Sequence, residues 1–203
     1  MIEAVQALEK ELNMIKNPTI REFTTFILTE APAYLTEVPS SSSGKYHPPQ
    51  SRVEPGGLIS HLRATVVFAN RLCRAYSIEK DDLDAVISAC LLHDILKYSD
   101  FEKGPHVKLK HTTKYHDYDS ALFVHLAATR YLTQSGTEVP WLKDITGCIA
   151  WHMGQWTKRK NPAHKVKKFP EEYSLLETIV HLADMCSSEP DVHLISLESS
   201  FVG

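Results

Sequence analysis

Apolar residues recur at steps of three and four along almost the whole chain, and this period is the strongest constraint on its fold. Asn17 followed by Pro18 supplies an N-cap and a first-turn proline for one of the helices. The only strand-like runs, such as residues 64–68, lie inside longer helical patterns. The sequence therefore predicts an all-α, single-domain bundle of six or seven helices. The predicted helices cover residues 2–15, 18–30, 58–77, 81–98, 114–135, 140–156 and 171–187.

The segments between these helices are typical of connections. Residues 31–38 form a short apolar piece, and residues 40–57 form the longest loop, which is rich in Ser, Pro and Gly. Residues 99–113 and 157–170 are polar and lysine-rich, so they also predict loops. No internal repeat and no linker interrupts the chain.

We divide the chain into three parts on this basis. The N-terminal helices with their Ser/Pro/Gly loop occupy residues 1–55, the main domain residues 56–187, and a C-terminal tail residues 188–203. Two alternatives are open for residues 2–30: they cover the bundle, or they form the contact of a homodimer.

Composition excludes several classes of protein. Of the 203 residues, 43% are hydrophobic and 23% charged, which is a globular rather than a disordered balance. A net charge of -3 argues against a protein that coats nucleic acid. No apolar stretch reaches the roughly 18 residues of a membrane span, and the first residues lack the pattern of a secretory signal. The four cysteines form no C-x-x-C pair and lie in apolar segments, which predicts reduced thiols and a cytoplasmic location.

A polar pair interrupts the apolar segment ACLLHDILKYS, where His93 precedes Asp94. Burying two such side chains is costly unless something satisfies them. In the predicted helix 81–98 the two would point about 100° apart, so they cannot form a parallel clamp, although both can reach a cation beside the helix. In this helix Lys97 lies one turn beyond His93, on the same face.

Other candidate ligands lie on neighbouring predicted helices. His61 in GGLISHLRAT and Asp184 in IVHLADMCS join His93 and Asp94 to give two imidazoles and two carboxylates. That mixed set suits Mn, Fe, Co, Ni or Zn, with Mg as a further alternative. A second site is predicted from His116 in KYHDYDSALF and His152 in CIAWHMGQW. Asp94 could then bridge two cations roughly 3.5–4 Å apart. His111 and His125 are rival candidates for the position given to His116.

The order His61, His93-Asp94, His116, His152, Asp184 resembles the HD-domain superfamily of metal-dependent phosphohydrolases. The stretches that carry the resemblance are GGLISH, LLHDILK, HDYDSA, IAWH and HLAD, and they span residues 56–186. The resemblance implies an all-α fold and one or two divalent cations held by those six residues. It also implies that Lys97 contacts phosphate or stabilises the transition state. The sequence departs from the family pattern at Leu96, where glycine is common, and at Met153, where some members have a second histidine.

The chemistry expected of such a site is hydrolysis by a cation-activated water, with Asp94 and Lys97 as the catalytic residues. No G-x-S-x-G motif is present to supply a different nucleophile. Asp117 and His111 are the candidates for the acid that protonates the leaving group, although Asp117 is expected to be exposed. His181 lies one turn before Asp184, and we expect it to support the ligands or to pack against them rather than to be a ligand itself.

Basic loops next to the predicted ligands favour a small phosphorylated substrate, most simply a nucleotide. The loop after His152 contains Lys158 and Lys160, and the stretch SSSSGKYH, which contains Lys45 and His47, leads into the His61 helix. These four residues and His111 are the predicted substrate-binding groups. The alternative is that both loops are ordinary solvated segments.

Three other functions share parts of the same sequence pattern. Similar domains occur in 3'–5' exonucleases that act on single-stranded nucleic acid, but those enzymes carry an additional binding module that this sequence does not contain. Some proteins with the same six ligands hold two irons and oxidise their substrates with oxygen. A sensor that binds a nucleotide without turnover is disfavoured, because no ligand of the set is missing.

Overall fold

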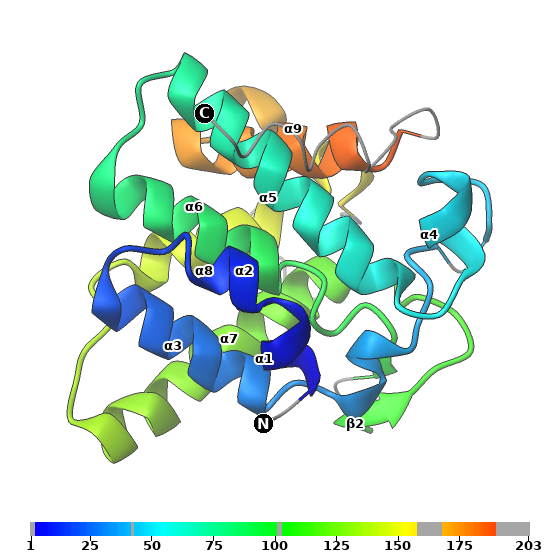
Figure 1. Ribbon diagram of the computed structural model, residues 1–203, viewed down its shortest axis with the longest axis horizontal. Helices are drawn as coiled ribbons and strands as arrows, with labels where there is room; N and C mark the ends of the chain where they lie inside the picture. Colours follow the sequence, from blue (N-terminus) through cyan, green and yellow to red (C-terminus); the bar gives the residue numbers. More distant parts are fainter. Residues whose placement is uncertain (1–2, 42, 101–102, 158–167, 190–203) are drawn as a thin grey trace.

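The computed structural model describes residues 3–41, 43–100, 103–157 and 168–189, and it confirms the all-α class. Figure 1 shows the bundle, with the α-helices α1 (Glu3–Ala7), α2 (Glu9–Leu12), α3 (Pro18–Thr29), α4 (Pro49–Val53), α5 (Gly57–Ala75), α6 (Lys80–Leu92), α7 (His116–Ser135), α8 (Leu142–Trp151) and α9 (Leu175–Ser187). Short 3-10 helices cover Ala33–Thr36, Gly154–Trp156 and Pro170–Glu172.

The most consequential departures from the sequence prediction lie at helix ends. The helix expected over residues 81–98 ends at Leu92, after which i→i+3 hydrogen bonds form tight turns through Ser99. The helix expected over 140–156 ends at Trp151, and a 3-10 turn follows. The turns after Leu92 are buried, so apolar spacing continues past that helix end; the turn after Trp151 is only partly buried, with Trp156 exposed, but its apolar residues still extend the pattern. Periodicity alone therefore does not locate either end.

Smaller departures concern the connections. The expected helix 2–15 is divided at Leu8 into α1 and α2, and Leu8 itself is fully buried. The loop 40–57 contains the short helix α4. The loop 99–113 contains a small antiparallel hairpin of strands β1 (Ser99–Asp100) and β2 (Gly104–Lys108).

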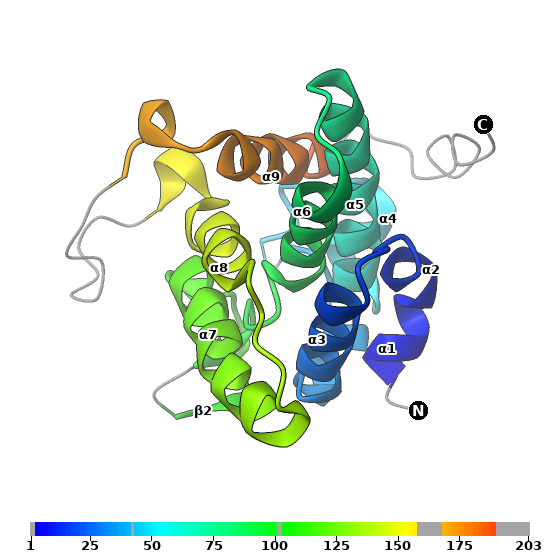
Figure 2. The ribbon, with the colours of Figure 1, turned by 90° about the vertical axis from the view of Figure 1, so that its left-hand side faces the viewer.

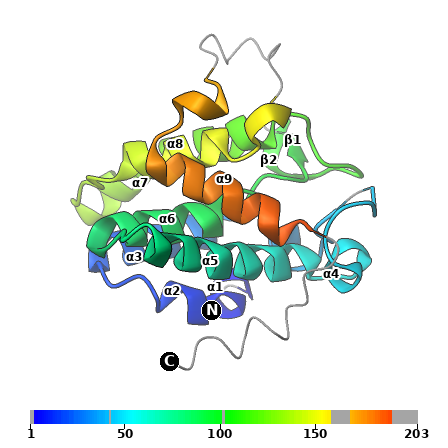
Figure 3. The ribbon, with the colours of Figure 1, turned by 90° about the horizontal axis from the view of Figure 1, so that it is seen from above.

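Helix α6 is the central element of the fold. Every residue from Asp84 to Leu92 is buried, and α6 packs against α2, α3, α5, α8 and α9. A helix that is apolar on all sides is stable only when other helices surround it. Figure 2 shows α5 and α6 side by side with α9 crossing them, and Figure 3 shows α9 lying between α8 and the α5–α6 pair. The C-terminal end of α6 is thus enclosed by α5, α8 and α9.

The N-terminal helices pack on the central domain as part of one apolar core. Leu12, Ile20, Phe23 and Ile27 are buried with the residues of α5 to α8. Asn17 caps α3 as its sequence predicts, since its side-chain oxygen accepts hydrogen bonds from the backbone N–H groups of residues 19 and 20. Covering the bundle is therefore the role that the structure gives these helices. Among the described residues, no helix is long and apolar enough to cross a membrane.

The start of α5 requires glycine for a steric reason. A Cβ on Gly57 would lie 1.8 Å from the carbonyl oxygen of Ser51, because α4 and the first turn of α5 touch through their backbones. The backbone N–H of Ser40 donates to the same carbonyl at 2.9 Å. This close approach fixes the start of α5 and therefore the position of His61, one turn further on.

A buried carboxylate fixes the N-terminal helices to α6. Asp84 is 3% exposed, and its Oδ2 accepts hydrogen bonds from the backbone N–H groups of Lys16 (3.0 Å) and Asn17 (2.6 Å). These two amides belong to the corner between α2 and α3, so the bonds join the corner to the first turns of α6.

We expect Asp84→Ala to destabilise the protein by about 2–3 kcal/mol, because two amides lose a charged acceptor. Chemical denaturation followed by circular dichroism would measure the change. Asp82→Ala is the matched control: Asp82 lies in the same helix but is exposed, so its removal should cost less than about 1 kcal/mol. Equal losses in both variants would contradict the role given to Asp84.

Candidate metal centre

Six side chains from five consecutive helices, α5 to α9, meet at one buried point. His61 lies in α5, and Asp184 in α9. His93 is the C-cap of α6, with Asp94 directly after it. His116 is the first residue of α7, and His152 is the C-cap of α8. The structure thus brings together all six residues that the sequence predicts as ligands, and they are His61, His93, Asp94, His116, His152 and Asp184.

Local hydrogen bonds fix which ring nitrogen carries the proton in three of the histidines. His93, His116 and His152 each direct Nδ1 at the backbone carbonyl oxygen three residues earlier, at 2.8, 3.1 and 2.7 Å. A carbonyl oxygen can only accept, so Nδ1 is the donor in each case. In the neutral ring Nε2 then presents its lone pair, and in all three residues Nε2 faces the centre.

His61 is oriented from α9 instead. Its Nδ1 lies 3.2 Å from the Oγ of Ser187, and that hydroxyl donates to the carbonyl oxygen of Asp184 at 2.8 Å. With its proton engaged there, the hydroxyl accepts from His61 Nδ1–H, and His61 Nε2 is free to face the centre. Ser187 lies three residues after Asp184 on the same helix, so one turn of α9 both supplies a carboxylate and orients His61.

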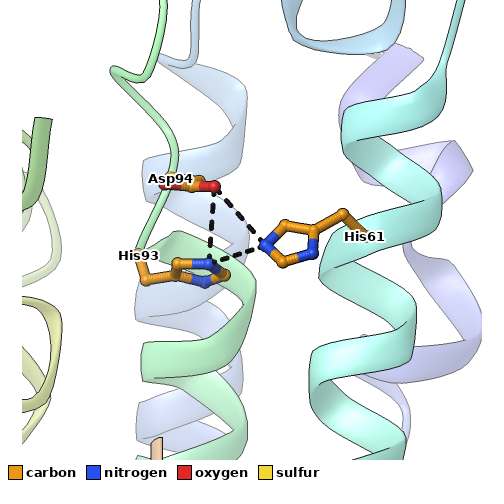
Figure 4. Close-up of side chains that lie close together, drawn as sticks. All are labelled: His61, His93 and Asp94. Atoms are coloured by element: carbon orange, nitrogen blue, oxygen red, sulfur yellow. Dashed lines mark hydrogen bonds and ion pairs between the residues drawn. The ribbon is translucent and has the colours of Figure 1, made fainter. Parts of the chain in front are cut away.

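The carboxylate of Asp94 divides the centre into two halves. Its Oδ2 lies 3.5 Å from the Nε2 atoms of both His61 and His93. Its Oδ1 lies 3.3 Å from His116 Nε2 and 3.6 Å from His152 Nε2. Figure 4 shows the first half, in which the two rings and the carboxylate converge from α5 and from the end of α6.

Asp184 completes the first half. Its Oδ1 lies 3.1 Å from His61 Nε2 and 3.5 Å from His93 Nε2. The two Nε2 atoms are themselves 3.2 Å apart. Two imidazole lone pairs cannot face each other at this distance without a positive charge between them, either a proton or a metal cation.

Helix ends add to the preference for positive charge. The C-terminal ends of α6 and α8 both terminate at the centre, at His93 and His152. Partial negative charge accumulates at the C-terminal end of a helix, where a nearby cation gains about 0.3–1 kcal/mol. The histidine Nδ1–H groups satisfy only one carbonyl in each of these last turns.

The ionisation of the carboxylates also fits a cation site. Although burial opposes ionisation, the charges of Lys97 and His93 hold the pKa of Asp94 well below its usual range. Burial likewise opposes ionisation of Asp184, but hydrogen bonds from His61 and His93 lower its pKa. Both carboxylates are therefore anionic at neutral pH.

Protonation divides the histidines into two pairs. Burial lowers the pKa of His93 and of His116, which favours the neutral imidazole that binds metals. Burial also lowers the pKa of His61 and of His152, but their interactions with the carboxylates outweigh it. The net result is a raised pKa for His61 and a pKa of about 9 for His152. At these two rings a proton and a metal cation compete for the same Nε2 lone pair.

The donors fit divalent cations in number, type and spacing. Three triads have ligand atoms within 4.8 Å of one another: His61–His93–Asp94, His93–His152–Asp184 and Asp94–His116–His152. Asp94 Oδ1 is fully buried, and the nearest histidine nitrogens, those of His116 and His152, lie 3.3 and 3.6 Å away, so this oxygen could serve as a ligand of a cation between them. Mixed nitrogen and oxygen donors are the set that first-row transition metals take, with Mg as the oxygen-preferring alternative.

Lys97 reaches this centre by a route that the sequence analysis did not predict. It does not share a helix face with His93, because α6 ends at Leu92 and Lys97 lies in the turns that follow. Its Nζ lies 2.5 Å from Asp94 Oδ2, and the side chain is nearly buried. The tight turn, rather than the helix repeat, brings the ammonium to the centre.

Two further histidines support the ligands from outside. The His47 ring lies edge-on to the His61 ring, with centroids 4.6 Å apart, and its Nε2 lies 3.2 Å from Ser188 Oγ. Burial, followed by the charges of His61 and Lys97, lowers the pKa of His47 to about 2. His181 directs Nδ1 at the backbone carbonyl oxygen of His152 at 2.6 Å, which agrees with the supporting role predicted for it.

The other predicted substrate-binding residues lie away from the six ligands or outside the described part. Lys45 and His111 are exposed. Lys158 and Lys160 lie outside the described residues. His125, a rival for the position of His116, is exposed on the outer face of α7.

The sequence analysis was wrong about Asp117. It expected an exposed acid, but the side chain is 0% exposed. The reason is that α7 begins at His116, so its first turn is buried against the centre. The sequence analysis also missed Ser187; its place one turn after Asp184 was the signal that could have identified it.

Comparison with known families supports the same assignment. The model of the HD domain matches residues 58–189, a span that includes all six ligand candidates. No curated protein and no solved structure matches the chain. Because the matched span covers well over half of the chain and runs from α5 through α9, the protein belongs to the HD-domain superfamily of metal-dependent phosphohydrolases.

Proposed function

We propose that the protein hydrolyses a phosphate ester, most simply that of a nucleotide, at a centre of two divalent cations. His61, His93, Asp94 and Asp184 would hold the first cation, and His116 and His152 the second, with Asp94 shared. The observation that carries the proposal is that the two oxygens of Asp94 face different pairs of imidazoles. A carboxylate used in this way is typical of two-metal hydrolytic sites.

In the reaction a water oxygen forms a bond to phosphorus while the ester P–O bond breaks, and the leaving alcohol takes up a proton. Bound cations lower the pKa of water and polarise the phosphoryl oxygen. The contribution of the chain is to hold its ligands rigidly: the Nδ1–H bonds keep each Nε2 directed inward, and burial of His93 and Asp94 keeps bulk water away.

Lys97 is proposed to stabilise the charge of the reacting phosphate. Its ammonium lies on the Oδ2 side of Asp94 and remains slightly exposed, so one of its three N–H donors can turn to a phosphate oxygen. A positive charge held in a largely dry site stabilises a transition state more strongly than the same charge in water.

A groove lined in part by the residue after Lys97 is proposed to take the phosphates that do not react. Ser41, Ser43 and Gly44 form one wall. Arg52 and Lys110 supply positive charge, while Lys108 pairs with Glu37 of the same groove at 3.5 Å. Tyr98, the residue after Lys97, lines the groove and donates its hydroxyl to the carbonyl of Pro39. Hydroxyls and cations at this position would favour a substrate with more than one phosphate, such as a nucleoside polyphosphate.

The other predicted substrate-binding residues, a homodimer and the cellular location belong to the same proposal. Lys45 lies in the loop that forms the groove wall, and His47 orients His61 from behind. His111, Lys158 and Lys160 stay predictions as substrate-binding groups, as does a homodimer. The four cysteines are free thiols, three of them buried, which supports the reducing cytoplasm as the proposed location.

The first prediction concerns the ligands. With Mn²⁺, Co²⁺, Ni²⁺ or Mg²⁺ and a panel of nucleotides and phosphomonoesters, wild-type protein should release alcohol and phosphate. His93→Ala and Asp94→Ala should lower kcat/KM by about 100-fold or more, because loss of partners even outside the ligand shell costs about 10–100-fold. His125→Ala removes an exposed imidazole from α7 and should retain activity. Activity that survives His93→Ala would refute hydrolysis at this centre.

The same panel separates the alternatives. Degradation of a labelled single-stranded oligonucleotide, with nucleotides left intact, would favour the exonuclease. Oxygen uptake by anaerobically iron-loaded protein, with no phosphate release, would favour the oxygenase.

The second prediction concerns metal removal. Treatment with a chelator should lower the thermal midpoint, and Mn²⁺ should restore it, because a ligand at 100 times its Kd stabilises the native state by about 2.7 kcal/mol. Differential scanning fluorimetry would measure the shift. Asp94→Ala removes the ligand common to both halves, so its midpoint should respond little to either treatment. An equal response of wild type and Asp94→Ala would show that Mn²⁺ binds elsewhere.

The third prediction concerns Lys97. Lys97→Met should keep the cations but lower kcat by about 100-fold, the usual cost of losing one group that stabilises transition-state charge. Elemental analysis of the purified variant would check metal content, and steady-state kinetics would give kcat. Lys143→Met, at an exposed position of α8, is the matched control. An unchanged kcat in Lys97→Met would exclude the ammonium from the reaction.

A further inference from the structure

A second buried carboxylate, that of Asp117, has no hydrogen-bond or ion-pair partner among the described residues. Asp117 is 0% exposed, and neither Oδ1 nor Oδ2 has a hydrogen-bond partner. None of the ion pairs among the described residues includes it; Lys97 pairs with Asp94, and Lys168 with Glu177. In its ionised form a carboxylate buried without a partner costs several kcal/mol, so a positive charge or donors from outside the described residues would stabilise it.

The surroundings of Asp117 locate that missing partner. Asp117 directly follows His116 at the start of α7, and both side chains are buried there. The pKa directions agree with this position, since a negative charge at Asp117 opposes the burial that lowers the pKa of His116 and adds to the effect of Asp94 and Asp184 that raises the pKa of His152. Asp117 therefore lies beside the second half of the centre.

Tyr173, on another element, packs against His181, which bonds to the carbonyl of the ligand His152. Its Oη is buried and also lacks a hydrogen-bond partner. Burial, then Glu177 and Asp117, raise the pKa of Tyr173 to about 12, which keeps the phenol protonated as a donor. Its ring lies at 90° to that of His181. A donor and an acceptor that lie near each other without bonding are satisfied by water between or beside them.

The charge of the second half is otherwise incomplete. His116 and His152 are neutral donors when they bind a metal, and Asp94 offers this half a single oxygen while its other oxygen serves the first half. A second divalent cation would thus be balanced only by part of one carboxylate, with the ammonium of Lys97 close by. A further negative charge is what this arrangement lacks.

We propose that Asp117 is the carboxylate that sets the affinity of the second cation, through hydrogen bonds from water molecules bound to that cation. Contact through water follows from position: none of the ligand groups with atoms within 4.8 Å of one another contains Asp117. The inference rests on the proposed two-cation centre, and it adds a residue outside the set of six. Asp117 is thus a positioning residue for the second cation rather than a direct ligand.

The test is titration of metal-free protein with Mn²⁺ alone, by isothermal calorimetry and by the electron paramagnetic resonance of free Mn²⁺. Wild type should bind two cations. Asp117→Asn, which keeps the shape but removes the charge, should weaken the second by about 10–100-fold and leave the first unchanged. His116→Ala marks complete loss of the second site. Asp144→Asn removes a charge from an exposed position of α8 and should bind as wild type does.

Stability of the metal-free variant provides an independent measurement. Asp117→Asn should not lower the thermal midpoint without metal, because the carboxylate has no hydrogen-bond partner among the described residues to lose. It should also reduce the gain in midpoint that saturating Mn²⁺ gives to wild type. A carboxylate that only supported the fold would give the reverse result, with a lower midpoint in the metal-free state.

The outcomes separate this inference from the function on which it rests. Two cations bound by Asp117→Asn with wild-type affinities would overturn the role of Asp117 and leave the two-cation centre intact. Unchanged binding with reduced phosphate release would also overturn it, because Asp117 would then act as a proton donor to the leaving group. Wild-type protein that binds no Mn²⁺, or one ion unaffected by His116→Ala, would overturn the two-cation centre itself.

Discussion

The buried carboxylate of Asp94 is the group on which the rest of the structure depends. It is 1% exposed, and five side chains surround it: Lys97 and the four histidines of the centre. A carboxylate in such a place is tolerated only where positive charge and donors meet it from several directions. Those directions correspond to different elements, so satisfying one charge requires α5, the start of α7 and the ends of α6 and α8 to meet at one point. The requirement explains why a polar cluster lies at the most enclosed position of an apolar bundle.

Helix ends, rather than helix faces, build most of this centre. His93 and His152 cap the C-terminal ends of α6 and α8, and His116 starts α7. An imidazole at a helix end can donate Nδ1–H to a carbonyl that the last turn leaves unsatisfied, and it then presents Nε2 outward along the axis. The carbonyl that orients His116 belongs to Thr113, before α7 begins, whereas His93 and His152 are oriented by their own helices, through bonds to the residues three positions earlier. The same ends bring partial negative charge to the place where a cation is needed.

The sequence was sufficient for the fold class and for the six candidate ligands, because both leave short-range patterns. Apolar steps of three and four predict helices, and a charged or ligating residue such as Asp184 within an apolar run is conspicuous. What the sequence did not reveal depends on where helices end. The end of α6 at Leu92 takes Lys97 off the helix face, and the start of α7 at His116 buries Asp117. These ends are set by tertiary packing of α5, α8 and α9 around the centre, which no local spacing encodes. Ser187 was missed for a related reason: its spacing from Asp184 is visible in the sequence, but its bond to His61 exists only because α9 lies against α5.

The central helix α6 connects the N-terminal helices to the centre. At its start Asp84 is held by the amides of Lys16 and Asn17, and just past its end His93 and Asp94 enter the centre. Between them every side chain is buried, so α6 has no solvent-facing side along which it could shift or rotate. A ligand pair mounted on such a helix keeps its position without the help of a cation. Rigid placement lowers the cost of binding and limits the geometries that a bound cation can take. The N-terminal helices therefore contribute to the centre although none of their residues touches it: they close the last open side of the helix that carries it.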